Sequence, residues 1–300
     1  MRGVERRRVG NRQEQAAAIR YASPVKFGFV FPGGDPVAVV EAAVAAEAAG
    51  WDGFFVWEAV WSADPWAMLG AIATRTERIR IGTLLTPLPI RRPWKLAAET
   101  ATVDQLSNGR LILAVGLGAP DTGYEAFGLP VDRRTRAELL DEGLAILTGL
   151  WAGQPFTFSG DHYEIGEAPL LIAAPEPVQR VGGVPHIPIW VVGAWGRPKS
   201  MRRVLGCDGF IPYVVPPEGG FLTAEQLPVG EMKTWLETHG PADRSIEIVV
   251  DGVTAGDDAA AQRSVLGPLA AAGATWWIET AWTADSRAVA TRIAQGPPST

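Results

Sequence analysis

The chain has 300 residues and a formal net charge of -6, with 47% hydrophobic and 20% charged residues, and this balance excludes a largely disordered protein. The acidic net charge leaves no overall basic field to recruit nucleic acid, and no apolar run approaches the roughly 18 residues of a membrane-spanning helix. The single cysteine, Cys207, excludes an internal disulfide, so we expect a soluble cytoplasmic protein.

Residues 1–24 differ from the rest of the chain. They contain a run of arginines, Arg6, Arg7 and Arg8 among them, that few acidic residues balance. We interpret this segment as a disordered basic extension. A nucleic-acid-binding arm and a transit peptide are the alternatives, whereas a secretory signal would need an apolar core after the arginines.

Strand-like and helix-like segments alternate from residue 25 to the end of the chain. Asp35-Pro36 and Asp64-Pro65 each read as an N-cap followed by a first helical residue. The strands are continuous apolar runs, as expected where both faces of a sheet are buried. The expected strands are 25–31, 54–57, 79–85, 111–115, 188–192, 209–213, 246–250 and 274–279, and the expected helices are 36–50, 65–73, 93–107, 134–151, 198–205, 223–238, 258–272 and 285–294.

Eight such units in succession predict one α/β domain over residues 25–300, a (β/α)8 TIM barrel. Short connections through Gly50, Gly206 and Gly273 fit the closed end of a barrel, although a doubly wound open sheet uses the same loops. One long insertion, about residues 153–187, separates the fourth helix from the fifth strand. Its segments 156–158 and 162–165 predict a β-hairpin.

Chemistry in a barrel lies where strands end and the following loops begin. Those positions here are rich in aromatic residues and glycine and contain no histidine, and no metal-ligand spacing or Ser/His/Asp set is present, so we expect no metal site. Such a pocket suits a flat organic cofactor that supplies the chemistry itself. The aromatic candidates are Phe31, Trp57, Trp61, Trp195, Tyr213 and Trp282.

Glu58 and Glu279 each end an apolar strand, where burying a charge costs free energy unless the charge is paired or used. Glu58 could serve a cofactor ring or donate a proton, or it could be a structural ion-pair partner of Arg91 or Arg92, and the same alternatives hold for Glu279. Gly116 and Gly118 would allow a ligand close to the backbone. The segment 193–196 leads into a helix start, where free N–H groups can hold a phosphate.

Several segments resemble the bacterial luciferase-like family of flavin- and deazaflavin-dependent oxidoreductases. The similarity covers about residues 25–296 and is most specific from Thr74 to Gly118. It is carried by Phe54-Phe55-Val56-Trp57-Glu58, Thr76-Glu77-Arg78-Ile79-Arg80-Ile81-Gly82-Thr83, Arg92-Pro93-Trp94-Lys95-Leu96-Ala97, the run from Glu99 to Arg110, Val115-Gly116-Leu117-Gly118 and Ile189-Trp190-Val191-Val192-Gly193.

The resemblance implies FMN or the deazaflavin coenzyme F420 at the barrel mouth. Relatives often have a non-proline cis peptide after the third strand, which Leu84-Leu85 would match, and a phosphate site after the fifth strand. The implied cofactor residues are Trp57, Glu58, Thr83, Leu84, Leu85, Gly116, Gly118, Gly193, Ala194, Trp195, Gly196 and Arg197, with Phe31, Trp61, Tyr213 and Trp282 at the substrate and Glu58 as the catalytic proton-handling group.

The resemblance thus implies an oxidoreductase or monooxygenase that acts on a small organic substrate, and a homodimer. Two departures stand out, because relatives commonly carry Asp-His where this chain has Glu58-Ala59, and an arginine where it has Ala194. A flavin-binding protein without turnover is therefore a second interpretation. A phosphate-substrate lyase or isomerase is a third, although no lysine stands at a predicted strand end.

Overall fold

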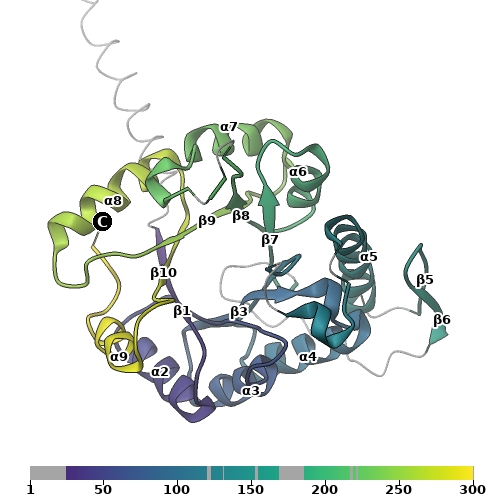
Figure 1. Cartoon of the computed structure of the whole chain (residues 1–300), viewed down its shortest axis with the longest axis horizontal. Coiled ribbons are helices and arrows are strands. Elements are labelled where there is room, and N and C mark those ends of the chain that lie inside the picture. The colour runs from purple at the N-terminus through teal and green to yellow at the C-terminus, as the bar shows by residue number, and fades with distance from the viewer. Residues whose placement is uncertain are drawn as a thin grey trace, which may run out of the picture.

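The central feature of the chain is a closed barrel of parallel strands (Figure 1). The computed structural model describes residues 25–119, 123–130, 132–152, 155–168, 186–216, 219–220 and 222–299, so the expected extension at residues 1–24 lies outside it. Around the barrel the strands follow the order β1-β10-β9-β8-β7-β4-β3-β2. They are β1 (Lys26–Phe31), β2 (Gly53–Val56), β3 (Arg80–Pro87), β4 (Leu111–Gly116), β7 (Ile189–Ala194), β8 (Gly209–Tyr213), β9 (Glu247–Gly252) and β10 (Trp276–Thr280).

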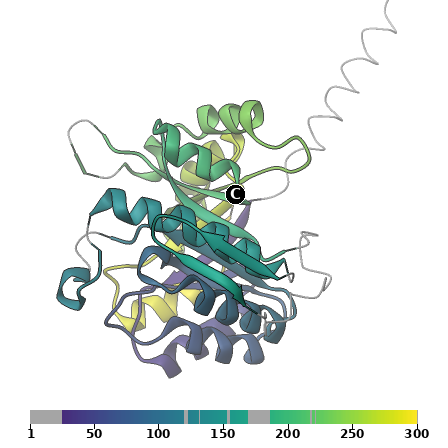
Figure 2. The same ribbon diagram turned by 90° about the vertical axis from the view of Figure 1, so that its right-hand side faces the viewer.

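This order confirms the (β/α)8 barrel and rules out the open sheet, because β1 pairs with both β2 and β10. Within the described residues, one α-helix follows each barrel strand, and the helices form an outer ring (Figures 1 and 2). They are α2 (Pro36–Ala48), α3 (Pro65–Arg75), α4 (Pro93–Leu106), α5 (Arg133–Trp151), α6 (Pro198–Leu205), α7 (Val229–His239), α8 (Ala259–Ala272) and α9 (Ser286–Ala294).

Aspartate caps begin many of these helices, as the sequence indicates. The Asp64 carboxylate accepts from the Ala67 N–H at 2.8 Å, and Asp285 accepts from the Ala288 N–H at the same distance. One expected helix is wrong in extent: residues 223–238 form a 3-10 turn, η3 (Ala224–Gln226), and then α7. Pro228 stands between the two as the N-cap of α7, and it breaks the helix because proline offers no N–H.

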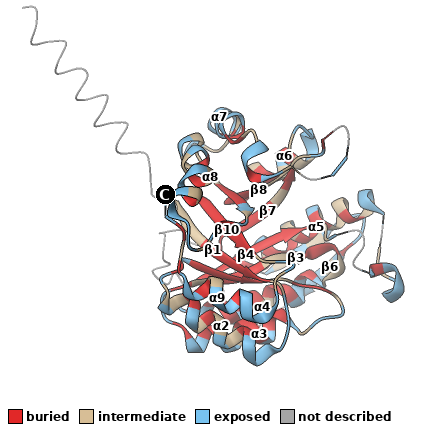
Figure 3. Cartoon of the chain, turned by 60° about the vertical axis from the view of Figure 1, so that its left-hand side comes forward, coloured by how far each residue is buried: buried red, intermediate tan, exposed pale blue. Residues whose placement is uncertain are grey.

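Two apolar layers hold the barrel. The larger lies between strands and helices, and the red strands inside the partly blue helices of Figure 3 show it. The smaller fills the barrel interior, where the rings of Trp190 and Trp276 meet at 5.1 Å and Phe55 lies 5.4 Å from Trp190. Below them, Lys26 at the start of β1 forms an ion pair of 2.6 Å with Glu247. The interior is therefore a packed plug.

The insertion carries the expected hairpin, β5 (Phe156–Ser159) paired antiparallel with β6 (Glu164–Ala168). It lies outside the barrel, beside α5 (Figure 1). Glu142 of α5 anchors its turn, because the carboxylate accepts from the backbone N–H groups of Asp161, His162 and Tyr163. Residues 169–185 of the insertion lie outside the described part of the chain.

Candidate active site

A cavity of about 220 Å³ lies at the carboxyl ends of the barrel strands. Its position follows from the plug, because the interior side chains one layer down fill the space beneath it. Ile211 of β8 and Leu84 and Leu85 of β3 pack against that plug and form the floor. The full lining is Trp57, Glu58, Leu84, Leu85, Pro87, Gly118, Ala119, Tyr124, Ile211, Asp251 and Trp282.

Leu84 and Leu85 both face the cavity although they are neighbours on one strand. The pairing of β3 with β4 shifts register between Thr83 and Thr86, which interrupts the usual alternation of side chains. The peptide bond between the two leucines is cis, as the family resemblance implies. Together the two leucine side chains form an apolar shelf at the cavity floor.

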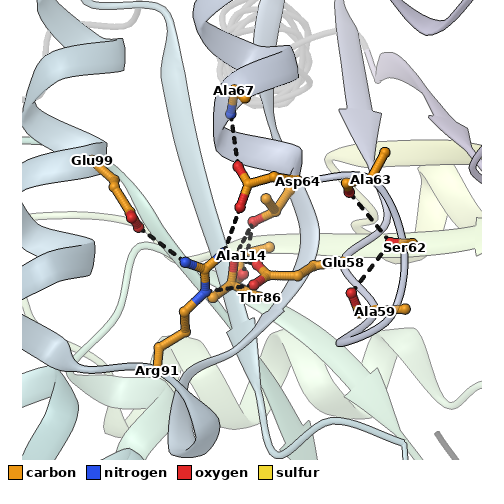
Figure 4. Close-up of polar contacts among 11 residues, drawn as sticks. Glu58, Ala59, Ser62, Ala63, Asp64, Ala67, Thr86, Arg91, Glu99 and Ala114 are labelled. Atoms are coloured by element: carbon orange, nitrogen blue, oxygen red, sulfur yellow. Dashed lines mark hydrogen bonds and ion pairs between the residues drawn. The ribbon is translucent and has the colours of Figure 1, made fainter. Parts of the chain in front are cut away.

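Glu58 is anchored on the α4 side of the cavity (Figure 4). The Arg91 Nε donates to Glu58 Oε1 at 2.6 Å, and Thr86 Oγ1 donates to Glu58 Oε2 at 2.7 Å. Arg91 also donates through Nη1 to Glu99 at 3.2 Å. The ion pair with Arg91, one of the two partners that the sequence offered, is therefore present.

Burial controls the ionisation of Glu58. Desolvation raises the pKa of the Glu58 carboxyl, while the Arg91 charge and the Thr86 hydrogen bond oppose that rise. Only 6% of Glu58 is exposed, and its accessible surface faces the cavity. The geometry thus gives a carboxyl group that is fixed in place, favours its proton more than a free glutamate does, and meets whatever occupies the cavity.

Asp251 presents a second carboxylate to the cavity from β9. Val249, two residues earlier, belongs to the barrel interior, so the alternation of a strand directs Asp251 to the same side at the mouth. The Asp251 side chain is exposed to solvent at the cavity, and the protein atoms around it raise the pKa of the carboxyl, while a hydrogen bond from its own backbone N–H opposes that rise. Among the described residues Asp251 has no ion-pair partner.

Three tryptophans stand together at the rim. The Trp57 ring lies 5.9 Å from Trp61 and 6.3 Å from Trp282, both in edge-on geometry. Trp57 and Trp282 line the cavity, while Trp61 packs on the outer side of Trp57 and is 60% exposed. The sequence-predicted aromatic residues Trp57, Trp61 and Trp282 are thus brought together.

Four other predicted residues lie away from the cavity lining. Phe31 is buried between the sheet and the helices, 6.0 Å from the Phe54 ring, and Thr83 is buried with its hydroxyl near the Ala114 carbonyl. Tyr213 lies 6.0 Å below the Arg133 guanidinium. Gly116 packs under Leu85, and a Cβ there would come within 3.0 Å of that side chain.

The predicted phosphate residues form a separate surface. Trp195, Gly196 and Arg197 line a groove of about 360 Å³ against α6 and α7, together with Pro198, Met201, Arg202, Leu205 and Trp235. No side chain caps the start of α6. The Ala194 N–H is occupied, because it donates to Ser200 Oγ at 2.8 Å. Cationic side chains and an uncapped helix start are thus adjacent, outside the mouth cavity.

Gly193 has a packing reason of its own. A Cβ at this position would lie 2.5 Å from the Phe210 ring and 2.6 Å from Val204. A larger residue would therefore disturb the layer between β7 and α6 whatever the ligand. Substitution of Gly193 cannot separate cofactor binding from folding, and its role at the cofactor stays a prediction.

Glu279 belongs to the structural layer and not to the cavity. Its carboxylate accepts from the Thr254 N–H at 2.8 Å and from Trp277 Nε1 at 2.9 Å, and it forms an ion pair of 3.3 Å with Arg292 of α9. Of the two alternatives for Glu279, the structure supports the ion pair.

The sequence places Asp251 at a strand end, among the positions where chemistry is expected, but it assigns no role to Asp251, Tyr124 or Ile211. Asp251 follows an apolar strand just as Glu58 does, so the same signal was available. Tyr124 lies on the 3-10 turn η2 (Tyr124–Phe127), which carries no strand-end signal. In the described residues, no group of three or more His, Cys, Asp or Glu side chains could hold a metal ion. No helix in the same residues is long and apolar enough to cross a membrane.

The fold and the site define the chain's class: it is a closed (β/α)8 barrel whose mouth holds an aromatic cavity with carboxylate side chains. The chain belongs to the luciferase-like monooxygenase family, whose model matches residues 14–290. An F420-dependent glucose-6-phosphate dehydrogenase of Nakamurella multipartita is 31% identical over 204 residues, 63% of this chain and 56% of that protein.

Relatives with either type of cofactor are present. The oxygenase component of a flavin-dependent trigonelline monooxygenase of Acinetobacter baylyi is 31% identical over 145 residues, 48% of this chain and 38% of that protein. The coenzyme F420-dependent tetrahydromethanopterin reductase of Methanopyrus kandleri shares the fold, with a TM-score of 0.69 at 15% identity over 92% of this chain and 99% of that one. The matches span about half the length of the first curated relatives.

Proposed function

We propose that this protein is an oxidoreductase that binds a reduced flavin or deazaflavin at the barrel mouth and acts there on a small organic substrate. The observation that carries the proposal is the cavity over Leu84 and Leu85, in a chain of the luciferase-like family. Relatives named for F420 and for flavin support both cofactor types, so the choice between FMN and F420 is part of the test.

The residues present fit a planar ring. Leu84, Leu85 and Ile211 offer an apolar floor, and Trp57 and Trp282 offer aromatic walls. At about 220 Å³ the cavity is smaller than the roughly 300–1,000 Å³ of a site for a drug-sized ligand, so it suits a ring system and not a whole nucleotide. When bound, the cofactor would supply hydride transfer or oxygen activation.

The chain itself would bind and orient the cofactor and the substrate and would control proton transfer. The aromatic walls would exclude water from the reacting face. Glu58 would hold a proton at a carboxyl oxygen on the cavity wall, with Arg91 and Thr86 fixing its position. We propose Glu58 as the catalytic acid, because its raised pKa keeps the proton available nearer to neutral pH than in a free glutamate.

The phosphate end of the cofactor would lie against the groove of Gly196 and Arg197. The uncapped start of α6 and the exposed Arg197 and Arg202 supply positive charge there. By the family resemblance we also propose a homodimer, which light scattering of the purified chain checks. A cytoplasmic location stays a prediction.

The experiment is a titration of the purified chain with FMN and, separately, with F420, followed by absorbance and fluorescence. We expect saturable binding of one of them. Ile211→Trp should fill the cavity and abolish that binding, while Leu106→Trp, the same side chain at an exposed end of α4, should leave it unchanged. Failure of both cofactors to bind would contradict the proposal.

One observation supports the alternative of a flavin-binding protein without turnover. The position after Glu58 is a buried alanine, Ala59, and no described cavity residue is a histidine. Rapid mixing of the reduced cofactor with oxygen and with carbonyl substrates separates the two functions. Binding with no oxidation above the rate in free solution would favour the alternative.

A further inference from the structure

In the described part of the chain, no basic side chain forms an ion pair with the Asp251 carboxylate. Its neighbour in the cavity, Glu58, meets Arg91 and Thr86, and the other strand-end carboxylate, Glu279, meets Arg292 and Thr254. Asp251 has no such partner among the described residues. Both of those carboxylates are paired, whereas the exposed side chain of Asp251 faces the cavity without a counter-charge from the part of the chain that the structure describes, so a cation in the cavity would meet that charge directly.

The surroundings of Asp251 select the charge of that ligand. The described lining residues include two carboxylates and no lysine, arginine or histidine, so the cavity has no positive side chain facing an incoming group. Arg91 is already shared among Glu58, Glu99 and Asp64. An anionic group beside Asp251 would be repelled, whereas a cation would find the counter-charge that the chain does not supply.

The aromatic walls favour the same ligand. Trp57 and Trp282 line the cavity together with Asp251, and tryptophan is the side chain whose ring face attracts cations best. Leu84, Leu85 and Ile211 beneath them exclude water. A carboxylate and tryptophan rings on the cavity wall form a site for an organic ammonium group, which is bulky, weakly hydrated and positively charged, above the floor that the cofactor ring would occupy.

We infer that the mouth cavity takes a substrate with a cationic nitrogen, and that Asp251 is its recognition residue. This inference deepens the proposed function, on which it rests for the statement that the cation belongs to the substrate. Cation binding itself requires only the cavity. Asp251 would set which molecules are accepted, while Glu58 on the other wall remains available for proton transfer.

The test uses choline and 3,3-dimethylbutan-1-ol, its uncharged carbon analogue, as probes of the full-length chain. Both carry the same hydroxyl group and nearly the same shape, so only the charge differs. Tryptophan fluorescence, with Trp57 and Trp282 in the lining, reports binding, and calorimetry checks it. We expect choline to bind at least about tenfold more tightly than the alcohol, the scale of a charge-assisted contact.

Asp251→Asn keeps the shape and removes the charge, and it should abolish that preference. Asp257→Asn is the matched control, because it removes the same charge from another exposed position, six residues later and outside the cavity lining, and should keep the preference. Circular dichroism checks that both variants fold. Choline affinity in the wild type should also fall as the pH is lowered, because protonation of Asp251 removes its charge.

Among the described lining residues, Glu58 and Tyr124 are the other titratable groups, and β8 and the loop after β10 contribute Ile211 and Trp282. The pH series is therefore repeated in Asp251→Asn, where it should be flat. Equal affinity for the two probes, no choline binding by the wild type, or undiminished choline preference in Asp251→Asn would each overturn the inference. Cofactor titration is a separate measurement. If choline fails these tests while FMN or F420 still binds, the inference falls and the proposed function stands. If choline passes them while neither cofactor binds, the proposed function falls and cation recognition stands.

Discussion

Glu58 and Asp251 line one cavity from strands separated by β1 and β10, and among the described residues only Glu58 has a cation beside it. Arg91 fixes Glu58 in one orientation, whereas no cation holds Asp251. The two carboxylates thus have different environments at the same site, and different environments are how a fold gives two acids different tasks. Removing Arg91 and neutralising Asp251 therefore test the two environments separately.

Arg91→Met should destabilise the protein by about 3–5 kcal/mol at neutral pH, because it leaves Glu58 buried without its counter-charge. Urea denaturation of wild type and variant measures the loss. The double variant Glu58→Gln/Arg91→Met is the control, since it removes the buried charge together with its partner and should recover much of the stability. A single variant within about 0.5 kcal/mol of wild type, the range of an ordinary surface change, would show that the pair contributes little.

Asp251→Asn should raise stability as the pH rises above the ordinary aspartate value of 3.8, by a small amount because the exposed side chain is screened by water. Because the folded pKa of Asp251 is raised, the folded state holds the proton more tightly, and wild-type stability falls as the pH rises through that folded pKa. Asparagine has no such dependence. Melting temperatures in a pH series measure the gap between the two proteins. A gap that stays constant with pH contradicts the raised pKa.

The two tryptophans of the barrel plug should respond differently to the same substitution. Trp190 Nε1 donates to Glu247 at 3.1 Å, whereas the buried Nε1 of Trp276 has no hydrogen-bond partner in the described structure. Both changes to phenylalanine remove similar volume, but only Trp190→Phe breaks a hydrogen bond and leaves Glu247 short of a donor. We expect Trp190→Phe to cost about 1–2 kcal/mol more than Trp276→Phe in urea denaturation. Equal losses would show that the indole hydrogen bond contributes nothing.

The thiol of Cys207 should be inert in the folded protein. Burial raises its pKa to about 12, and only 4% of the residue is exposed, so the reactive thiolate is scarce at pH 8. A disulfide reagent should label the native chain far more slowly than the chain in urea. Because Cys207 is the chain's one cysteine, the labelling rate reports opening of this region alone. Immediate labelling of native protein would contradict the prediction.

The sequence was sufficient for the barrel but not for the direction of its side chains. Aspartate-proline pairs and glycine turns marked where most elements begin and end, and the structure confirms them within a few residues. Strands buried on both faces are apolar throughout, so a run such as Trp276-Trp277-Ile278 hides the alternation that tells inside from outside. For that reason Phe31 was expected at the substrate, although Val30 beside it is the residue that faces the interior.

The site was predicted least well where it depends on contacts between distant segments. Glu58 and Glu279 looked alike in sequence, and only the positions of Arg91 and Arg292 show that one faces the cavity while the other is tied to a helix. Tyr124 reaches the cavity from a turn whose path no local pattern specifies. Asp251 is a charged residue at the end of an apolar strand, as Glu58 is, but the sequence does not distinguish such a residue from an ordinary polar strand end.

The plug of Trp190, Trp276 and Phe55 has a kinetic consequence. It closes the barrel below the mouth, so a ligand on the leucine floor can exchange only through the rim where Trp57 and Trp282 stand. Cofactor and substrate would then share one entrance, and the deeper one must arrive first and depart last. We expect the ligands to add in a fixed order, which would appear as product inhibition that is competitive with the first ligand alone. We also expect the turnover rate to be limited by ligand exchange through this single opening.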